Sequence, residues 1–347
     1  MVIPKPLTII GGGLAGLTLG IGLRKQNVPV TVLEAGHYPR HRVCGEFISG
    51  RGQEVLERLG LRESFLEAGA IPAQTAAFFS GATQSPPRSL DPPALCLSRF
   101  KMDALLAARF ESLGGDLRQG ARWRGNGAQE AVVHASGRHA QPQDHGWRWF
   151  GLKVHAQNLP LAADLEMHIA PNGYVGLCQL KGGEMNICGL FRRRAHGETS
   201  ATNWKEILSG EPGSALRRRF ADAVFDESSF CSVAGLCLAP QRASEVEKCW
   251  IGDALTMIPP VTGNGMSMAF ESAEIAIGPL TRYSQGQLSW RQAQQAVATA
   301  CDSAFAQRLA WAKWLQWMMF AQPFHGGLAK LALNSGWLWR LMFARTR

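Results

Sequence analysis

The order of apolar and polar residues at the beginning of the chain is that of a strand, a helix and a second strand. Residues 7–10 and 30–34 are short runs rich in β-branched residues, and residues 14–23 form an apolar run of helical length. A glycine-rich turn, residues 11–16, joins the first strand to the helix. Two short β-branched runs on either side of a helical segment predict a βαβ unit with parallel strands.

The pattern changes further along the chain. Residues 51–68 have a helical period, and residues 100–113 form another helical segment, which a pair of glycines ends. Residues 71–97 are rich in β-branched, aromatic and proline residues, and residues 131–135 form an apolar run of strand length. Residues 147–238 alternate short apolar runs with glycine turns, which predicts a mostly antiparallel sheet.

These elements predict an α/β fold. A Rossmann-like nucleotide-binding domain is interleaved with a mostly antiparallel β-sheet substrate domain, and helices follow at the C-terminus. The predicted boundaries are residues 1–70, 98–140 and 241–290 for the nucleotide-binding domain, 71–97 and 141–240 for the substrate domain, and 291–347 for the C-terminal helical region.

The composition is that of an ordinary globular chain, with 46% hydrophobic and 18% charged residues among 347. The cysteines and histidines have neither CxxC nor metal-binding spacing, so we expect reduced thiols and no metal site. The net charge of +9 includes two short basic runs, Arg192–Arg194 and Arg217–Arg219. Without a nucleic-acid fold signature, these runs indicate a solvated surface or a contact with a prenyl phosphate or a membrane head group, and no nucleic acid.

The apolar segment near the N-terminus does not have the pattern of a targeting sequence. No basic segment precedes residues 7–23, and no small-residue cleavage site follows them. No run reaches the roughly 18 to 20 uninterrupted apolar residues of a membrane span. We therefore expect the chain to begin within its fold and to be cytoplasmic.

The glycine-rich turn has the spacing of a dinucleotide-binding fingerprint. Gly11 permits the tight turn, Gly13 lets the backbone approach a pyrophosphate, and Gly16 lets the helix pack closely on the sheet. The helix that begins at Leu14 and Ala15 offers free N–H groups and its positive dipole end to phosphates.

An acidic residue completes this fingerprint. Glu34 ends the second strand 18 residues after Gly16, which is the distance at which an acid reaches ribose hydroxyls. A strand before the glycines and an acid after the second strand make the motif much more specific than the glycines alone.

Later segments add to this site. Arg99 opens a helix, residues 135–138 end a strand, and Gly252 and Asp253 end another strand. The turn at residues 259–266 then directs a helix N-terminus toward whatever lies beyond it. Together with the glycine turn and Glu34, these segments point to one ligand.

This set of motifs resembles the flavoprotein superfamily of aromatic hydroxylases, geranylgeranyl reductases and flavin-dependent halogenases, over most of residues 5–280. The resemblance implies FAD as cofactor, with Glu34 at the adenosine ribose, Asp253 at the ribityl chain and the 259–266 turn at the isoalloxazine. The residues that the resemblance assigns to FAD are Gly11, Gly13, Leu14, Ala15, Gly16, Glu34, Arg42, Cys44, Arg99, Gly252, Asp253, Pro260, Gly263, Asn264, Gly265 and Met266.

The halogenase branch fits poorly. Its Trp-x-Trp-x-Ile-Pro motif would align with residues 173–179, which lack both tryptophans and the proline. Trp147 and Trp149 have the spacing, but we interpret them as an interior aromatic pair on a strand. The region before residue 100 offers only Lys5 and Lys25 as the lysine that such enzymes need.

The other two branches fit in different segments. Ordinary hydroxylases of this class carry Asp-Gly where this chain has Ser136-Gly137, and a His where it has Leu255-Thr256. Geranylgeranyl reductases resemble it at residues 44–46, 171–174 and 260–265. The resemblance therefore favours the geranylgeranyl reductase-like branch, although Gly176 and Gln179 replace its usual Trp and Pro.

This branch implies hydride transfer from the N5 atom of reduced flavin to a carbon–carbon double bond of an apolar, isoprenoid-like substrate. Cys44 and Glu46 would lie near the flavin ring, with Cys44 as proton donor or positioning group, and Tyr174 is a second catalytic residue. Each also has a structural interpretation as a buried side chain. The alternatives are a monooxygenase that modifies a hydrophobic metabolite, and a flavoprotein without catalytic function.

The sequence leaves open the role of the C-terminal segment and the identity of the electron donor. Tryptophans and methionines follow helical spacing from Trp311 to Phe320, with Lys and Arg interspersed. This region predicts core packing or a lid, a membrane-surface helix, or the wall of a lipid-sized pocket. No second nucleotide domain is present for the reductant, so NADPH, a ferredoxin or free reduced flavin could reduce the cofactor.

Overall fold

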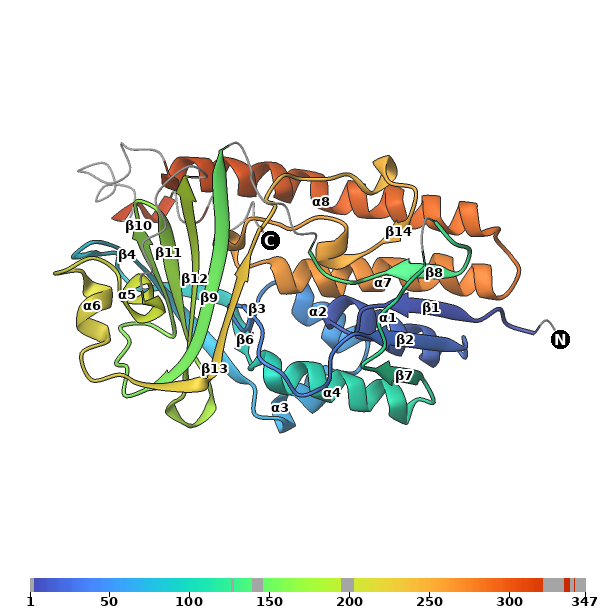
Figure 1. Cartoon of the computed structure of the whole chain (residues 1–347), viewed down its shortest axis with the longest axis horizontal. Coiled ribbons are helices and arrows are strands. Elements are labelled where there is room, and N and C mark those ends of the chain that lie inside the picture. Colours follow the sequence, from blue (N-terminus) through green and yellow to red (C-terminus); the bar gives the residue numbers. More distant parts are fainter. Residues whose placement is uncertain are drawn as a thin grey trace.

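The computed structural model describes residues 3–125, 128–138, 146–194, 203–320, 334–337 and 340. Two sheets lie side by side, and helices cover them (Figure 1). The smaller sheet is wholly parallel, as the βαβ pattern predicts. Its strand order is β14 (Cys249–Trp250), β8 (Val132–His134), β1 (Leu7–Ile10), β2 (Val30–Glu34) and β7 (Asp116–Gln119).

The predicted βαβ unit is confirmed at the centre of this sheet. Helix α1 (Leu14–Lys25) connects β1 to β2 and is buried from Leu14 to Leu23. A side chain at Gly20 would collide with the Phe110 ring, and one at Gly22 would collide with Ile277. The two glycines therefore let α4 (Arg99–Ser112) and α7 (Gly265–Ser284) pack closely on α1.

The larger sheet is mostly antiparallel, as predicted, with one parallel pair between β4 and β10. Its order is β13 (Val224–Ala234), β9 (Trp147–Gln157), β12 (Met185–Arg194), β11 (Gly173–Gln179), β10 (Leu165–Ala170), β4 (Ile71–Ser80), β6 (Arg88–Cys96) and β3 (Phe47–Ile48), and β5 (Thr83–Gln84) pairs with β4.

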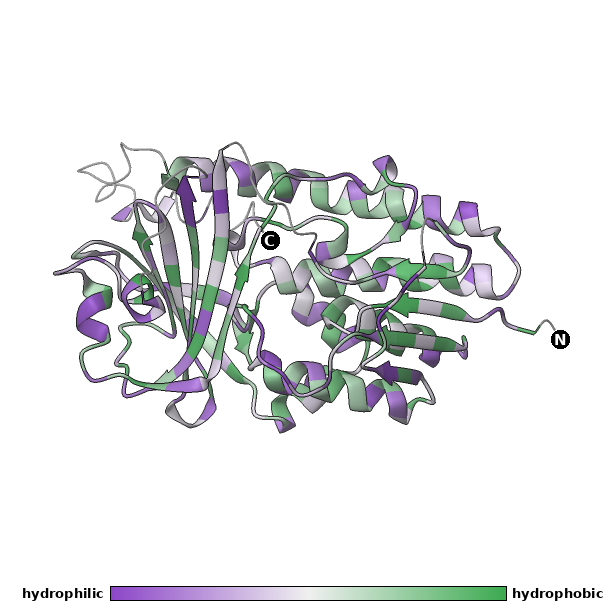
Figure 2. Cartoon of the chain, in the orientation of Figure 1, coloured by the Kyte–Doolittle hydropathy of each residue, from purple (hydrophilic) through white to green (hydrophobic). Residues whose placement is uncertain are grey.

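The large sheet has two different faces because side chains alternate along each strand. Leu152 and Val154 of β9 belong to an apolar cluster with residues of α5 (Trp204–Ser209) and α6 (Ala215–Arg219). Trp149 of the same strand packs on the opposite side, in a cluster with residues of α8 (Trp290–Phe320). Figure 2 shows both hydrophobic and hydrophilic positions along these strands.

The helical segment predicted at residues 51–68 is two helices. They are α2 (Arg51–Arg58) and α3 (Arg62–Glu67), and Gly60 between them has φ of 62°. Because this left-handed backbone cannot continue an α-helix, the chain turns there. The remaining described elements are short 3₁₀ turns at Lys181–Gly183, Ala243–Glu245, Gly252–Ala254 and Pro260–Thr262.

The C-terminal region begins with α8, which runs beside α7 and reaches over the large sheet (Figure 1). Arg308 of α8 and Glu271 of α7 form a buried bidentate pair with N–O distances of 2.5 and 2.7 Å. Among the described residues, no helix combines the length and apolar character needed to cross a membrane. Residues 321–333, 338–339 and 341–347 of the predicted C-terminal region lie outside the described residues. The domain boundaries given above stay a prediction.

Candidate functional site

The glycine turn brings three chain segments into backbone contact. A Cβ atom at Gly11 would lie 2.4 Å from the carbonyl oxygen of Ala135, just after β8. A Cβ atom at Gly16 would lie 1.9 Å from the carbonyl oxygen of Gly11. These contacts leave no room for a side chain, so both glycines are required by packing of the turn itself.

The third glycine of the fingerprint has different surroundings. No atom lies within 4 Å of a Cβ built at Gly13, and the same holds at Gly137 after β8. Gly13 is the N-cap of α1, and no side-chain cap or first-turn acid is found there. The first N–H groups of this helix are therefore available for an anion, as a bound pyrophosphate requires.

The segment at Gly252 and Asp253 lies beside the same helix terminus. A Cβ at Gly252 would lie 2.8 Å from that of Ala15, which brings Asp253 next to the start of α1. The Asp253 side chain is exposed to solvent, yet desolvation by the surrounding protein raises the pKa of its carboxyl, while Arg99 and Arg138 lower it. An accessible carboxylate with protein around it fits a group that pairs with ligand hydroxyls.

Glu34 ends β2 as predicted, and its carboxylate is buried. It accepts hydrogen bonds from the N–H groups of Gly12 and Gly36, at 2.9 and 2.8 Å, and pairs with Arg40 at 2.6 Å. Burial raises the pKa of Glu34, but these partners outweigh it and lower the pKa overall. The acid thus ties the glycine turn to the loop after β2 while lying at the position predicted for a ribose contact.

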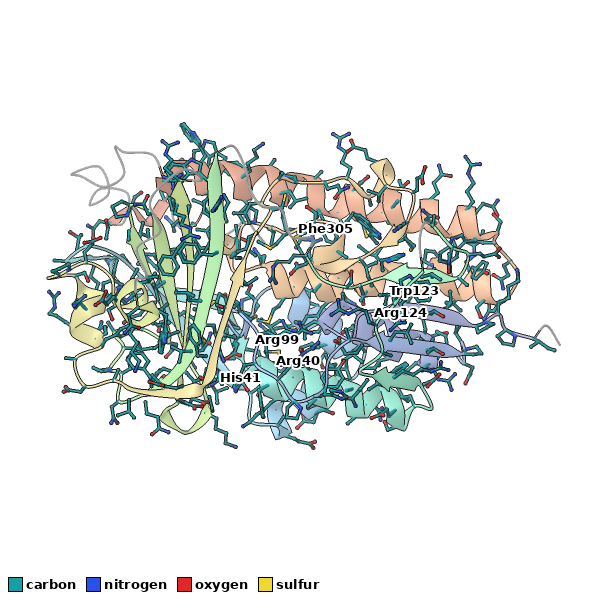
Figure 3. All side chains as sticks on the ribbon, viewed as in Figure 1. Arg40, His41, Arg99, Trp123, Arg124 and Phe305 are labelled. Carbon is teal, nitrogen blue, oxygen red and sulfur yellow. The ribbon has the colours of Figure 1, made fainter. Side chains whose placement is uncertain are left out.

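Two predicted cofactor arginines meet at one aspartate. Arg99 makes a bidentate pair with Asp103, with both distances 2.9 Å, and Arg42 reaches the same carboxylate at 3.2 Å. Figure 3 shows Arg99, Arg40 and His41 gathered where the two sheets meet. Asp103 is fully buried and therefore fixes both guanidinium groups beside the glycine turn.

The turn before α7 packs on the segment that contains Cys44 and Glu46. Gly263 has φ of 66°, and a side chain there would collide with the Phe47 ring. The Ser49 hydroxyl lies 3.2 Å from both the Gly263 carbonyl and the Asn264 side chain. Asn264, the N-cap of α7, is buried and makes no side-chain cap bond to the helix. Pro260, Gly265 and Met266 lie in this same turn.

Glu46, predicted to be catalytic, is a fully buried connecting group. Its Oε1 accepts a hydrogen bond from the Arg99 N–H at 2.8 Å and lies 3.6 Å from Nζ of Lys153. Its Oε2 lies 2.7 Å from Nε2 of His155. Both carboxylate oxygens of Glu46 therefore have protein partners. This geometry favours a positioning role for Glu46, and its catalytic role stays a prediction.

The protonation states in this network follow from its partners. His155 lies between two carboxylates, Glu46 and Glu184, and carboxylates only accept, so both ring nitrogens carry protons. Burial lowers the pKa of His155, but the bonds to Glu184 and Glu46 raise it overall. Lys153 donates to Nδ1 of His41 at 3.0 Å, so His41 is neutral; burial and Lys153 lower its pKa.

Lys153, His155 and His41 were not singled out by the sequence analysis. A signal was present in residues 151–157, where Lys153 and His155 interrupt a buried strand at alternate positions. Polar residues two apart in such a strand share a face and need buried partners. Which partners they have could not be read from the sequence, because Glu46 lies more than a hundred residues away.

Cys44 lies two residues before Glu46 in the chain and is half-buried. Its carbonyl oxygen accepts a hydrogen bond from Asn186 of β12 at 2.9 Å. Burial raises the pKa of the Cys44 thiol, while the neighbouring Arg99 lowers it. The thiol is therefore a neutral group, as a proton donor must be, and its catalytic role stays a prediction.

Tyr174 lies in an apolar cluster on the face of the large sheet that carries Lys153 and His155. The buried members of this cluster are Trp149, Tyr174, Leu190, Leu236, Leu238, Val261, Leu315 and Met319. Trp147 packs against the cluster, so the two tryptophans are an aromatic pair at least partly inside the protein. Their contact with Tyr174 was not foreseen, because it depends on strand pairing of β9, β12 and β11.

The hydroxyl of Tyr174 is buried and has no hydrogen-bond partner among the described residues. Burial raises the pKa of Tyr174 well above its usual value, so the phenol is neutral. A buried hydroxyl without a partner costs about 1–3 kcal/mol. This cost is relieved when a ligand group pairs with it.

Residues 5–157 match the family described as FAD binding domain. This match covers less than half of the chain, so it shows a similarity of this part to that family. The open N-terminus of α1 and the glycine contacts described above fit the cofactor that the family name states.

Curated relatives match only in part. Rifampicin monooxygenase of Rhodococcus hoagii is 32% identical over 117 residues, which are 33% of this chain and 24% of that protein. Squalene epoxidase erg1 of Aspergillus fumigatus is 35% identical over 68 residues, 20% of this chain and 14% of that protein. The chain thus spans about a quarter or less of these two relatives.

A solved structure shows the same fold along the whole chain. The flavin-dependent brominase Bmp2 superposes with a TM-score of 0.76, over 99% of this chain and 93% of that chain, at 16% identity. The predicted fold class, a Rossmann-like FAD domain interleaved with a sheet domain and followed by helices, is confirmed.

We expect Gly13→Ala to separate FAD binding from folding. The added methyl group has open space, so the free energy of unfolding without FAD should change by less than about 0.5 kcal/mol. The methyl group would occupy the approach of the pyrophosphate and lower FAD affinity roughly tenfold or more. Flavin fluorescence titration and urea unfolding measure the two effects.

Gly16→Ala is the matched control for this experiment. Its methyl group would collide with the Gly11 carbonyl and should destabilise the apoprotein by about 2 kcal/mol. If the Gly13 variant binds FAD as tightly as the unaltered protein, the pyrophosphate does not lie against this turn.

The buried network predicts a pH dependence of stability. The pKa of His155 is raised in the folded protein, so its contribution is complete below about pH 6.5 and is lost as pH rises through the folded pKa. His155→Gln should therefore cost most stability near pH 6 and progressively less at higher pH. Urea unfolding of both proteins from about pH 6 to about pH 9 measures this difference.

His168 provides a control, because its contribution to stability should have the opposite pH dependence. It is buried beside Glu166, but desolvation lowers its pKa overall. Its contribution is complete above about pH 6.5 and is lost as pH falls. A loss of stability in His155→Gln that is constant with pH would show that His155 is not charged in the folded protein.

Proposed function

We propose that the chain is an FAD-dependent monooxygenase whose substrate is an apolar molecule bound against the large sheet. The observation that carries this proposal is the unpartnered, buried hydroxyl of Tyr174 within an apolar cluster. Pockets for small molecules combine such apolar walls with a few polar groups that fix orientation.

The cluster lies beside the turn predicted to contact the isoalloxazine. Val261 belongs both to the cluster and to the 3₁₀ turn Pro260–Thr262, three residues before the N-cap of α7. Leu315 and Met319 of α8 close the cluster on the other side. A substrate among these side chains would therefore be held between the sheet, the turn and α8, and shielded from water.

Two relatives support oxygenation as the reaction. Both rifampicin monooxygenase and squalene epoxidase have names that state oxygen insertion. When bound and reduced, the flavin supplies the electrons that activate molecular oxygen. In this proposal Tyr174 orients the substrate, the Glu46 network holds the segment containing Cys44, and the apolar cluster excludes water.

Reduction of a carbon–carbon double bond is the second candidate. The Cys44–Glu46 segment, which resembles geranylgeranyl reductases, favours it, and the thiol of Cys44 is neutral and able to donate a proton. Hydride transfer from reduced flavin to one carbon would then be completed by this proton at the other carbon.

Product mass distinguishes the two candidates. The FAD-loaded protein would be mixed with NADPH or dithionite and with squalene, geranylgeraniol or a long-chain alkylphenol, under ¹⁸O₂ and separately under argon. Oxygenation adds one labelled oxygen atom and needs oxygen. Reduction adds two hydrogen atoms under argon. A product with two added hydrogens and no label would contradict the first candidate.

Tyr174→Phe should separate stability from turnover. Removing an unpaired buried hydroxyl should leave the free energy of unfolding unchanged or raise it by up to about 1 kcal/mol. Losing one hydrogen bond to the substrate should lower kcat/KM about three- to tenfold. Urea unfolding and the product assay measure the two quantities on the same preparation.

Tyr283→Phe is the matched control. The Tyr283 hydroxyl donates to Glu130 at 2.8 Å, so its removal should cost about 1 kcal/mol of stability and leave kcat/KM unchanged. If Tyr174→Phe instead loses stability and retains turnover, the Tyr174 hydroxyl has a structural role and does not contact the substrate.

A further inference from the structure

We propose that the last turns of α8 and the end of β12 form a surface that docks on an anionic lipid bilayer. Trp314 and Trp317 of α8 are 43% and 69% exposed. Large apolar side chains are rarely exposed together on a soluble surface without a partner, and tryptophan prefers the boundary between water and lipid. We refer to Trp314, Trp317, Lys313 and Arg194 as the Trp–Arg surface.

The arrangement of α8 makes its two sides different. Lys313, Trp314 and Trp317 are exposed, whereas Leu315 and Met319 of the same turns are buried in the apolar cluster. Because the inner side holds the helix in place, the exposed tryptophans are presented by a fixed element. They do not need to fold on contact, so docking costs little ordering entropy.

Basic residues lie at the end of α8 that carries these tryptophans. Arg192 and Arg194 of β12 lie over the Trp147 ring, on the face of the sheet that packs on α8, and Arg194 is exposed. The Arg192 guanidinium lies 4.3 Å from the Phe320 ring centroid and donates to the Phe320 carbonyl at 3.4 Å. Figure 1 shows the far end of α8 passing over the ends of the large-sheet strands.

The charge of this surface is of one sign. From residue 303 to residue 320 of α8, and from residue 185 to residue 194 of β12, the sequence contains no Asp or Glu. Exposed tryptophan with Lys and Arg, and without acids, complements a membrane leaflet that carries anionic head groups. This complementarity selects the bilayer over a second copy of the chain, whose matching surface would repel it.

Docking in this position has a consequence for substrate supply. The same turns of α8 cover the apolar cluster, so a molecule dissolved in the bilayer would enter beside it. This consequence alone rests on the proposed function, whereas docking itself is measured without substrate.

Vesicle sedimentation tests the inference with the FAD-loaded full chain. We expect the protein to sediment with phosphatidylcholine vesicles containing phosphatidylglycerol, and at least about tenfold less with phosphatidylcholine alone. Trp314→Ala with Trp317→Ala, and Lys313→Glu with Arg194→Glu, should each lower binding to the anionic vesicles about tenfold or more. Thermal unfolding checks that each variant is folded.

Arg62→Glu with Arg109→Glu is the matched control, because it makes the same charge change at exposed positions of α3 and α4, which lie away from α8 (Figure 1). This control should retain at least half of the binding. The inference is overturned if the unaltered protein stays in the supernatant, or if the control loses as much binding as the Lys313–Arg194 variant. The inference is also overturned if the tryptophan variant binds the vesicles as the unaltered protein does. The same holds if light scattering shows that the tryptophan substitutions only abolish self-association of the protein.

Discussion

The buried carboxylate of Glu46 is the interaction on which the relation between the two sheets depends. It lies in the segment between β2 and β3, caps the start of α4 through the Arg99 N–H, and meets Lys153 and His155 from the middle of the large sheet. Transferring a carboxylate out of water is costly, so the fold tolerates it only because two cations and a helix N-terminus surround it. Glu46 also has a φ of 59°, a conformation that non-glycine residues rarely adopt and that these contacts maintain.

These contacts of Glu46 explain why polar and apolar residues occupy separate parts of one face of the large sheet. Lys153 pairs across the strands with Cys188, and His155 with Asn186, next to Glu46. Two residues further along the strands, Gly151 pairs with Leu190, and Leu190 pairs with Tyr174. The charged rows therefore anchor the sheet to the loop of Cys44, and the apolar rows that follow belong to a cluster with Val261 of the turn that precedes α7 and with Leu315 and Met319 of α8.

The packing around the glycine turn depends on close contact between backbone segments rather than on charge. Gly11, Gly16 and Gly252 bring the ends of β1 and β8, the start of α1 and the Asp253 turn within van der Waals contact of one another. Gly13 and Gly137 then leave open space at the same place. Contact at three glycines and space at two others is what a phosphate-binding turn requires, since the ligand must reach backbone N–H groups directly.

The sequence by itself determined the parts of this protein that depend on neighbouring residues. The βαβ unit, the dinucleotide-binding fingerprint from Gly11 to Glu34 and the antiparallel character of the sheet domain follow from local spacing and periodicity. The division of residues 51–68 at Gly60 also had a local cause, but a helical period alone did not reveal it. Only the tertiary structure decided that Glu46 is buried between Lys153 and His155, that Tyr174 lies with Trp149 and α8, and that Trp314 and Trp317 point outward while Leu315 and Met319 point inward. These relations join residues that are distant in the sequence, or depend on which side of a helix is covered, and no local pattern encodes either of them.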